Sequence, residues 1–124
     1  MNNSRLKEKT GYNEKITVYI PSTINIDDVS GNSKSININN ESFVNEAAEM
    51  LSKLYGGFTI LKSEGGWYSD ERKQLERENV TLIYAFSDNI ESGLDVVIDY
   101  CEYLKKALNQ DAISIEVNNT LYFI

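Results

Sequence analysis

Apolar and polar residues alternate along several short stretches of the chain, with the period of two that is typical of β-strands. Ile16, Val18 and Ile20 alternate with polar or aromatic residues, and this pattern predicts the first strand. Residues 80–86 are apolar at nearly every position, which favours a strand in the interior of a sheet. We therefore expect Leu82 of this strand to lie in the core.

Two further stretches complete the expected sheet. Residues 58–61 predict a strand that continues until the glycine pair at 65–66 breaks it or forms a bulge. Residues 69–78 carry many charges and predict a loop. Residues 113–117 alternate again, and the Asn-Asn turn that follows predicts a hairpin with residues 121–124.

Two longer segments have apolar residues at steps of three and four, which predicts two amphipathic helices. The first covers residues 43–55 and ends where Gly56 can adopt a left-handed conformation. The second covers residues 90–108, and Asp88 with Glu91 forms a candidate capping box at its start.

The expected order of elements is strand, helix, strand, strand, helix, strand, followed by the terminal hairpin. This order predicts an α+β fold, a βαββαβ ferredoxin-like sandwich whose antiparallel sheet has two helices on one face and a C-terminal β-hairpin extension. No helix remains to cover the second face of the sheet. We expect that open sheet face to meet solvent, the terminal hairpin, a ligand or a second copy of the chain.

The length of 124 residues accommodates one domain with one core. Residues 1–14 have no periodicity and predict a flexible leader, so the single α+β domain is expected to cover residues 15–124. Within this domain, residues 27–40 are rich in Ser, Asn and Asp and predict a mobile connection. No segment resembles a membrane-spanning helix or a signal peptide, so we expect no membrane association and a cytoplasmic location.

The composition of the chain limits the chemistry that it can perform. Histidine is absent, so any catalysis would depend on Asp, Glu, Lys, Tyr or a bound cofactor. Cys101 is the single cysteine and falls on the apolar side of the second helix, which predicts a buried thiol. The sequence predicts no catalytic residue, no metal site and no cofactor. The net charge of −7 disfavours direct nucleic-acid binding and is compatible with a basic protein partner.

Five carboxylates in and just before the second helix recur at steps of three and four residues, which places them along one helical face. Such an acidic row can dock onto an Arg-rich partner, and it can equally be a solvated surface that keeps a small protein in solution. The residues of the acidic row are Asp88, Glu91, Asp95, Asp99 and Glu102.

A second group of candidate binding residues combines glycines, aromatic rings and carboxylates around residues 65–71. Trp67 can stack on a ligand while neighbouring polar groups contact it, or the indole can simply cover the edge of the core. Aromatic side chains on the open sheet face can serve core or dimer packing. The candidates are Trp67, Tyr68, Asp70 and Glu71 in the predicted hairpin loop, and Tyr19 and Tyr84 on the open sheet face.

A set of local motifs resembles small uncharacterised ferredoxin-like α+β proteins of plasmids and phages. The motifs are the helix at 43–55, the segment Gly56-Gly57-Phe58-Thr59, the Gly65-x-Trp67 segment and the strand Val80-Thr81-Leu82-Ile83. This resemblance implies an accessory protein of a mobile element, and it implies no particular activity for any residue.

Two functional hypotheses follow from these features. The leading one is a non-enzymatic protein-binding accessory or inhibitory protein of a mobile genetic element, which acts through the acidic row and the aromatic hairpin loop. The alternative is a small-molecule-binding protein or enzyme of the dimeric α+β barrel type, in which two open sheet faces enclose a pocket. Tyr19, Trp67, Tyr68 and Tyr84 would line that pocket. A closed cavity with converging polar groups between the sheet and a partner would favour the second hypothesis, and a flat, filled sheet face would favour the first.

Overall fold

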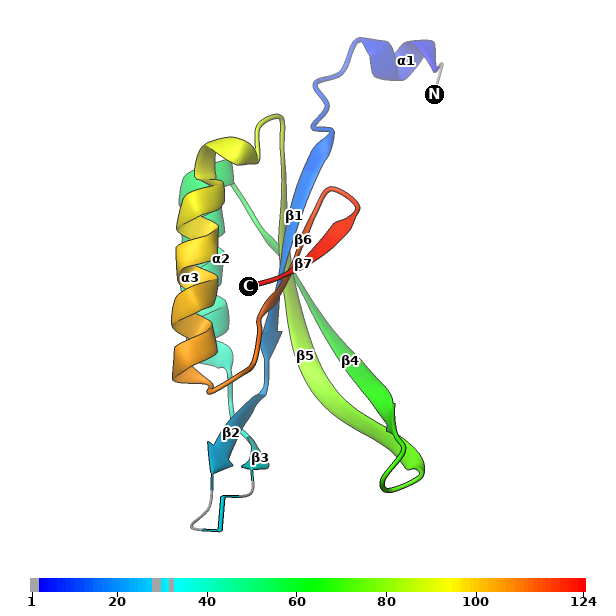
Figure 1. Ribbon diagram of the computed structural model, residues 1–124. Helices are drawn as coiled ribbons and strands as arrows, with labels where there is room; N and C mark the ends of the chain where they lie inside the picture. Colours follow the sequence, from blue (N-terminus) through cyan, green and yellow to red (C-terminus); the bar gives the residue numbers. More distant parts are fainter. Residues whose placement is uncertain (1–2, 28–29, 32) are drawn as a thin grey trace.

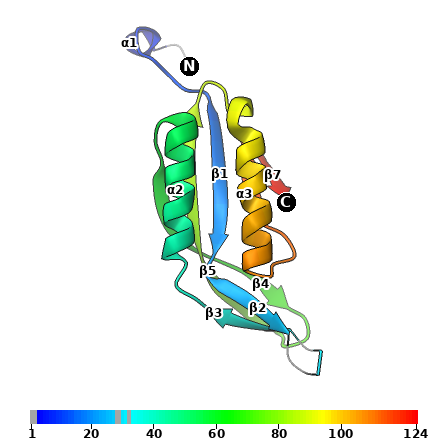
Figure 2. The same ribbon diagram turned by 90° about the vertical axis from the view of Figure 1, so that its left-hand side faces the viewer.

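The computed structural model describes residues 3–27, 30–31 and 33–124, and it contains a five-stranded antiparallel sheet with two long helices on one face (Figure 1, Figure 2). The long helices are α2 (Glu41–Tyr55) and α3 (Leu94–Ala107). From one edge to the other, the strands are β4 (Thr59–Ser69), β5 (Gln74–Ser87), β1 (Glu14–Pro21), β6 (Ser114–Val117) and β7 (Thr120–Phe123). This arrangement confirms the predicted ferredoxin-like α+β fold with a C-terminal hairpin.

The core lies between the two helices and the sheet. Because side chains alternate across a strand, Ile16, Val18 and Ile20 of the central strand β1 all face the helices, and none is exposed. From α2, Ala47 and Leu51 pack against them. The buried residues of α3 are Val97, Cys101 and Leu104. The predicted burial of Cys101 is thereby confirmed.

The hairpin formed by β4 and β5 is longer than the sequence pattern predicts. The glycine pair at 65–66 does not break β4, and the predicted loop at 69–78 is wrong because β5 already begins at Gln74. The far half of this hairpin extends beyond the helices (Figure 1). Since both of its faces meet solvent there, cross-strand hydrogen bonds can hold charged residues in a strand without burying their charge.

A small second sheet lies where the sequence predicts only a connection. Strand β3 (Ser33–Asn37) falls within the predicted connection 27–40 and pairs antiparallel with β2 (Thr23–Asp27). Residues 28–29 and 32 of that connection lie outside the described residues, and its mobility stays a prediction. Ile24 and Ile26 belong to β2, a strand separate from β1.

The end of α2 agrees with the sequence, and the start of α3 does not. Gly56 adopts a left-handed conformation with φ of +89° directly after α2, as predicted. A short 3₁₀ turn, η1 (Glu91–Gly93), precedes α3 and replaces the predicted capping box of Asp88 and Glu91. Asn89 instead accepts a hydrogen bond from the backbone N–H of Ser92 at 3.3 Å.

The segment before the sheet contains the one-turn helix α1 (Ser4–Lys7), none of whose residues is buried. Residues 1–2 of the predicted leader lie outside the described part of the chain, and the flexibility of the leader stays a prediction. Within the described ranges, no helix is long and apolar enough to cross a membrane.

The open sheet face, on the side away from the helices, carries several apolar side chains. The register pairs Leu82 with Leu61 on one side and with Tyr19 on the other, so these three residues lie side by side on this face. Leu82 is half-buried here, and its predicted position in the core is wrong. Its neighbour Ile83 occupies the core, because a strand that is apolar on both faces does not reveal which face meets the helices.

Candidate functional site

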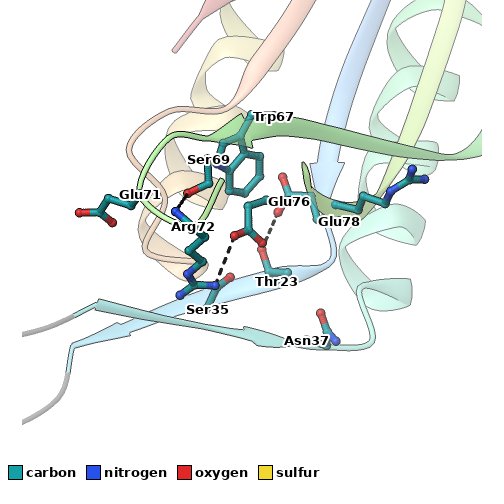
Figure 3. Close-up of a pocket in the computed structure, with 10 residues that line it drawn as sticks. Thr23, Ser35, Asn37, Trp67, Ser69, Glu71, Arg72, Glu76 and Glu78 are labelled. Atoms are coloured by element: carbon teal, nitrogen blue, oxygen red, sulfur yellow. Dashed lines mark hydrogen bonds and ion pairs between the residues drawn. The ribbon is translucent and has the colours of Figure 1, made fainter. Parts of the chain in front are cut away.

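A hollow of about 400 Å³ lies between the projecting β4–β5 hairpin and the small β2–β3 sheet (Figure 3). We name it the hairpin hollow. Its walls combine an aromatic ring, hydroxyl and amide groups, three carboxylates and two guanidinium groups. The lining residues are Thr23, Ser35, Asn37, Trp67, Ser69, Glu71, Arg72, Glu76, Arg77 and Glu78.

The hairpin register brings the indole and two carboxylates onto one face. Trp67 pairs with Glu76, and Gly65 pairs with Glu78, so all four residues lie on the same side of the two strands. The Trp67 ring is 56% exposed, which leaves its surface accessible to a flat ligand.

The charged groups of the hairpin hollow differ in whether they form ion pairs. Arg72 Nη1 lies 3.3 Å from Glu76 Oε1, and Arg77 Nη1 lies 2.7 Å from Glu64 Oε1. Among the described residues, the half-buried Glu78 has no ion-pair partner. The Glu78 carboxylate is therefore available to attract a cationic ligand.

A buried hydroxyl group makes a long hydrogen bond to Glu78. Thr23 is only 5% exposed, and its Oγ1 donates to Glu78 Oε2 at 3.4 Å. In turn, Gln110 Nε2 donates to the carbonyl oxygen of Thr23 at 3.1 Å, and Asn109 Nδ2 donates to that of Asn25 at 2.9 Å. The segment after α3 thus fixes β2, and β2 positions Glu78.

The structure separates the residues predicted in the hairpin loop. Trp67 and Glu71 line the hairpin hollow, although the Glu71 carboxylate points outward in Figure 3. Tyr68 pairs with Leu75 on the opposite face of the hairpin and is 57% exposed. Asp70 lies in the exposed turn and does not line this hollow.

Tyr19 and Tyr84 lie on the open sheet face, as the alternation suggests, and neither lines the hairpin hollow. The Lys15 ammonium is 4.3 Å from the centroid of the Tyr84 ring and 5.5 Å from that of Phe86. These contacts are cation–π interactions at the surface of the sheet. A binding role for the two tyrosines stays a prediction.

The acidic row lies apart from the hairpin hollow. All five of its side chains are exposed, on η1, on α3 or just before them, and none lines the hollow. Glu102 Oε2 is 3.2 Å from the Lys105 ammonium, one turn further along α3. The row thus belongs to the helical side of the molecule.

Sequence reasoning misses Glu76 and Glu78, because the charges at 69–78 predict a loop. The alternation of side chains along β5 does contain a signal for both glutamates. Glu78 and Glu76 continue the phase of Val80 and Leu82 toward the hairpin tip, so they share the open face of the sheet. Thr23 has no comparable signal, since its position depends on the long-range contacts of β2.

Two titratable groups of the helical layer, the buried Cys101 and the half-buried Tyr100, take no part in the hollow. Burial, with a smaller contribution from Glu102, raises the pKa of the Cys101 thiol to about 12, so this thiol stays protonated at neutral pH. Burial also raises the pKa of Tyr100, whose hydroxyl donates to the carbonyl of Phe43 at 2.8 Å. Over the described ranges, no group of three or more His, Cys, Asp or Glu side chains is arranged to hold a metal ion.

Comparison with known proteins finds similarity only at the level of structure. No known protein family matches the sequence, and no curated protein sequence matches it. A phage SAM lyase in complex with S-methyl-5′-thioadenosine is similar with a TM-score of 0.60 and 13% identity, over 94% of this chain and 93% of that chain. A phage SAM lyase in the apo state is similar with a TM-score of 0.62 and 14% identity, over the same shares. At this identity the likeness establishes a shared fold, and it fits the predicted resemblance to small phage proteins.

These neighbours contradict the leading functional hypothesis of a non-enzymatic, protein-binding accessory protein. Both are enzymes named for a small-molecule reaction, and they fit the alternative of a small-molecule-binding protein or enzyme. The physical reason for the error is that an exposed acidic helix and an exposed aromatic ring are surface features. They do not distinguish a docking surface from the outside of an enzyme.

Proposed function

We propose that this chain is a small-molecule enzyme that binds S-adenosylmethionine (SAM), or a closely related sulfonium compound of adenosine, and cleaves it as a lyase. The observation that carries the proposal is the hairpin hollow, in which an exposed indole stands beside an unpaired carboxylate. The comparison with solved structures supports the proposal, because this chain shares its fold with a phage SAM lyase over 93% of that protein's length.

The groups of the hairpin hollow suit the parts of such a ligand. An adenine ring is flat and stacks favourably on an indole such as that of Trp67. Ribose hydroxyl groups need hydrogen-bonding partners, which Ser35 and Asn37 offer on β3. A sulfonium is a permanent cation, and the Glu78 carboxylate supplies the opposite charge.

The reaction that we propose needs no histidine. Release of S-methyl-5′-thioadenosine from SAM breaks the bond between sulfur and the methionine-derived carbon chain, and the bonding electron pair moves to sulfur. The sulfur becomes a neutral thioether, which makes it a good leaving group without protonation. A lyase adds no water, so the released carbon chain completes its valence from its own atoms, by ring closure or by loss of a proton. The protein's task is then mainly to bind and orient the substrate.

The main test is direct measurement of the product. Purified protein is incubated with SAM, and S-methyl-5′-thioadenosine is quantified by liquid chromatography. We expect product to form, and we expect Trp67→Ala to lower kcat/KM by about fivefold or more, because base stacking on an aromatic side chain contributes roughly 1–3 kcal/mol.

Tyr68→Ala is the matched control for this test. Tyr68 is the next residue in β4 and is equally exposed, but it lies on the opposite face of the hairpin. We expect its kcat/KM to stay within about twofold of the wild type, since surface substitutions usually have small effects. Failure of the wild-type protein both to form product and to bind SAM would refute the proposal.

The open sheet face supports a second part of the proposal, namely that a second copy of the chain packs on it. Leu61 on one edge strand of this face, and Leu121 and Phe123 on the other, are 53%, 46% and 70% exposed, and a second copy would remove this apolar surface from water. The acidic row lies on α3 and η1, so it does not oppose contact between two copies through the sheet. For the same protein we propose a phage or mobile-element origin and a cytoplasmic location, where SAM is consumed.

A further inference from the structure

A second hollow, of about 330 Å³, lies on the open sheet face beside the hairpin hollow. Its lining combines apolar side chains, such as Leu82 and Ile113, with the polar groups of Tyr19, Gln110 and Glu64. Glu78 lines both this second hollow and the hairpin hollow. The unpaired carboxylate therefore lies at the junction of two cavities.

The residue opposite Glu78 leaves this junction uncovered. Gly65 pairs with Glu78 across the hairpin, and it has no side chain to lie over the carboxylate. A Cβ atom at Gly65 would meet only Val80 Cγ1, at an ordinary contact distance of 3.9 Å, and the backbone does not adopt a positive φ there. Neither the space around residue 65 nor its backbone conformation requires a glycine at this position. Glycine inside a strand marks a bulge, a tight bend, or a point where a ligand or another backbone approaches closely, and the pairing register of β4 runs through Gly65 without a bulge.

From this arrangement we infer that one extended cationic ligand spans both hollows, with its positive centre over Gly65 and beside the Glu78 carboxylate. The inference rests on the proposed function, because SAM has this form: a sulfonium joins an adenosine to an amino-acid chain. The adenosine occupies the hairpin hollow beside Trp67, and the amino-acid chain extends into the second hollow. There the Tyr19 hydroxyl can donate to the ligand's carboxylate, and Gln110 Oε1 can accept from its ammonium group.

Glu78 and Gly65 then act as specificity-determining residues that distinguish substrate from product. S-methyl-5′-thioadenosine is neutral at sulfur and lacks the amino-acid chain, so it fills the hairpin hollow alone. SAM gains the charge contact with Glu78 and the contacts of the second hollow. A charge-assisted interaction is stronger than a neutral one, so the substrate is held more tightly than the product.

Calorimetric titration of wild type and variants with SAM and with S-methyl-5′-thioadenosine tests this inference, with the release of product kept negligible by low temperature and short contact. Gly65→Val places a β-branched side chain over the junction, and valine is well suited to a strand. We expect it to weaken SAM binding by about tenfold or more and to change binding of the product by less than about twofold. Glu78→Gln should do the same, because it removes the charge and keeps the shape.

Two controls make the result specific. Glu91→Gln removes one charge from the exposed acidic row and should leave the binding of both ligands unchanged. Thermal melts establish that Gly65→Val is folded, and Gly65→Ala serves as a smaller substitution should valine disturb the hairpin.

Each outcome of the titrations is informative. If the wild type binds both ligands and Gly65→Val or Glu78→Gln weakens both equally, the junction does not select for the cation, and the inference is wrong while the proposed function stands. If the folded variants bind SAM as well as the wild type does, the inference is also wrong. If the wild type binds neither ligand, both the inference and the proposed function fail.

Discussion

At the scale of single residues, the two neighbouring glycines of β4 differ in what they require. A Cβ atom at Gly66 would collide with the backbone carbonyl oxygen of Glu76, whereas Gly65 has room for a side chain. Gly66 is thus a structural glycine that allows two strands to approach closely. Gly65 is open to substitution as far as the fold is concerned.

This difference predicts unequal effects of the same mutation. Gly66→Ala must shift the backbone of the hairpin, so we expect it to lower the free energy of unfolding by roughly 1–3 kcal/mol. Gly65→Ala should change it by less than about 0.5 kcal/mol. Chemical denaturation of both variants, with hydrogen exchange of the β4–β5 amides, measures the effect. Equal stability of the two variants would contradict the close approach at Gly66.

The sequence identifies Trp67 and Glu71 as candidates because rare or clustered side chains stand out from their neighbours. It does not identify Glu78, whose significance comes from what lies around it: the Thr23 hydroxyl, the bare Gly65 and the lack of an ion pair. None of these is local in sequence. A carboxylate among other charges looks ordinary until the fold shows which of them form ion pairs and which of them are half-buried.

At the scale of elements, the two faces of β5 have different energetic roles. Ile83 is completely buried between the sheet and the helices, whereas Leu82 is half-buried on the open sheet face. We expect Ile83→Ala to cost about 2–5 kcal/mol of unfolding free energy, because it leaves a cavity in the core. Leu82→Ala should cost clearly less in the isolated chain.

Urea melts of the two variants check this expectation. Ile20→Ala on β1 is a suitable positive control, because it is buried on the same side of the sheet. A larger loss for Leu82→Ala than for Ile83→Ala would mean that the open face is packed more tightly than the structure indicates.

The elements that the sequence predicts well are those with a single clear period. The sequence predicts α2 and the glycine that ends it, because the apolar side chains of this helix recur on one face. The outer half of β5 and the β2–β3 hairpin are missed, because their residues are charged or polar and their strands are stabilised by pairing with each other. Propensity predicts these segments as loops, and pairing with the adjacent strand of the same hairpin overrides that preference.

At the scale of the whole molecule, the acidic row and the exposed apolar side chains of the open sheet face lie on opposite sides of the sheet. The acidic row is on α3 and η1, and the exposed apolar side chains of the sheet are on the face without helices. If that face is covered by a second copy, sedimentation or light scattering should give at least twice the mass of the 124-residue chain. Combined Leu61→Lys and Leu121→Lys substitutions should then yield a folded monomer.

Val96→Lys is the control for this experiment, since Val96 is 51% exposed on α3, on the helical side. It should leave the mass unchanged. A monomeric wild-type protein would exclude packing through the open sheet face under the conditions measured.

The position of β1 in the sheet has a consequence for how the protein is made. β1 is synthesised before every other strand of the sheet, yet its partners are β5 and β6, and its backbone contacts reach 103 residues along the chain, from Lys15 to Asn118. While the ribosome is still adding residues, α2 and the β4–β5 hairpin can form from local contacts, but Ile16, Val18 and Ile20 have no complete core to enter. Contacts of such long sequence separation form slowly and leave apolar strands exposed in the meantime. We therefore expect chaperones to bind β1 in nascent chains that are stalled before Ser114. We expect the chain to reach its native fold only after the segment that contains β6 has left the ribosome.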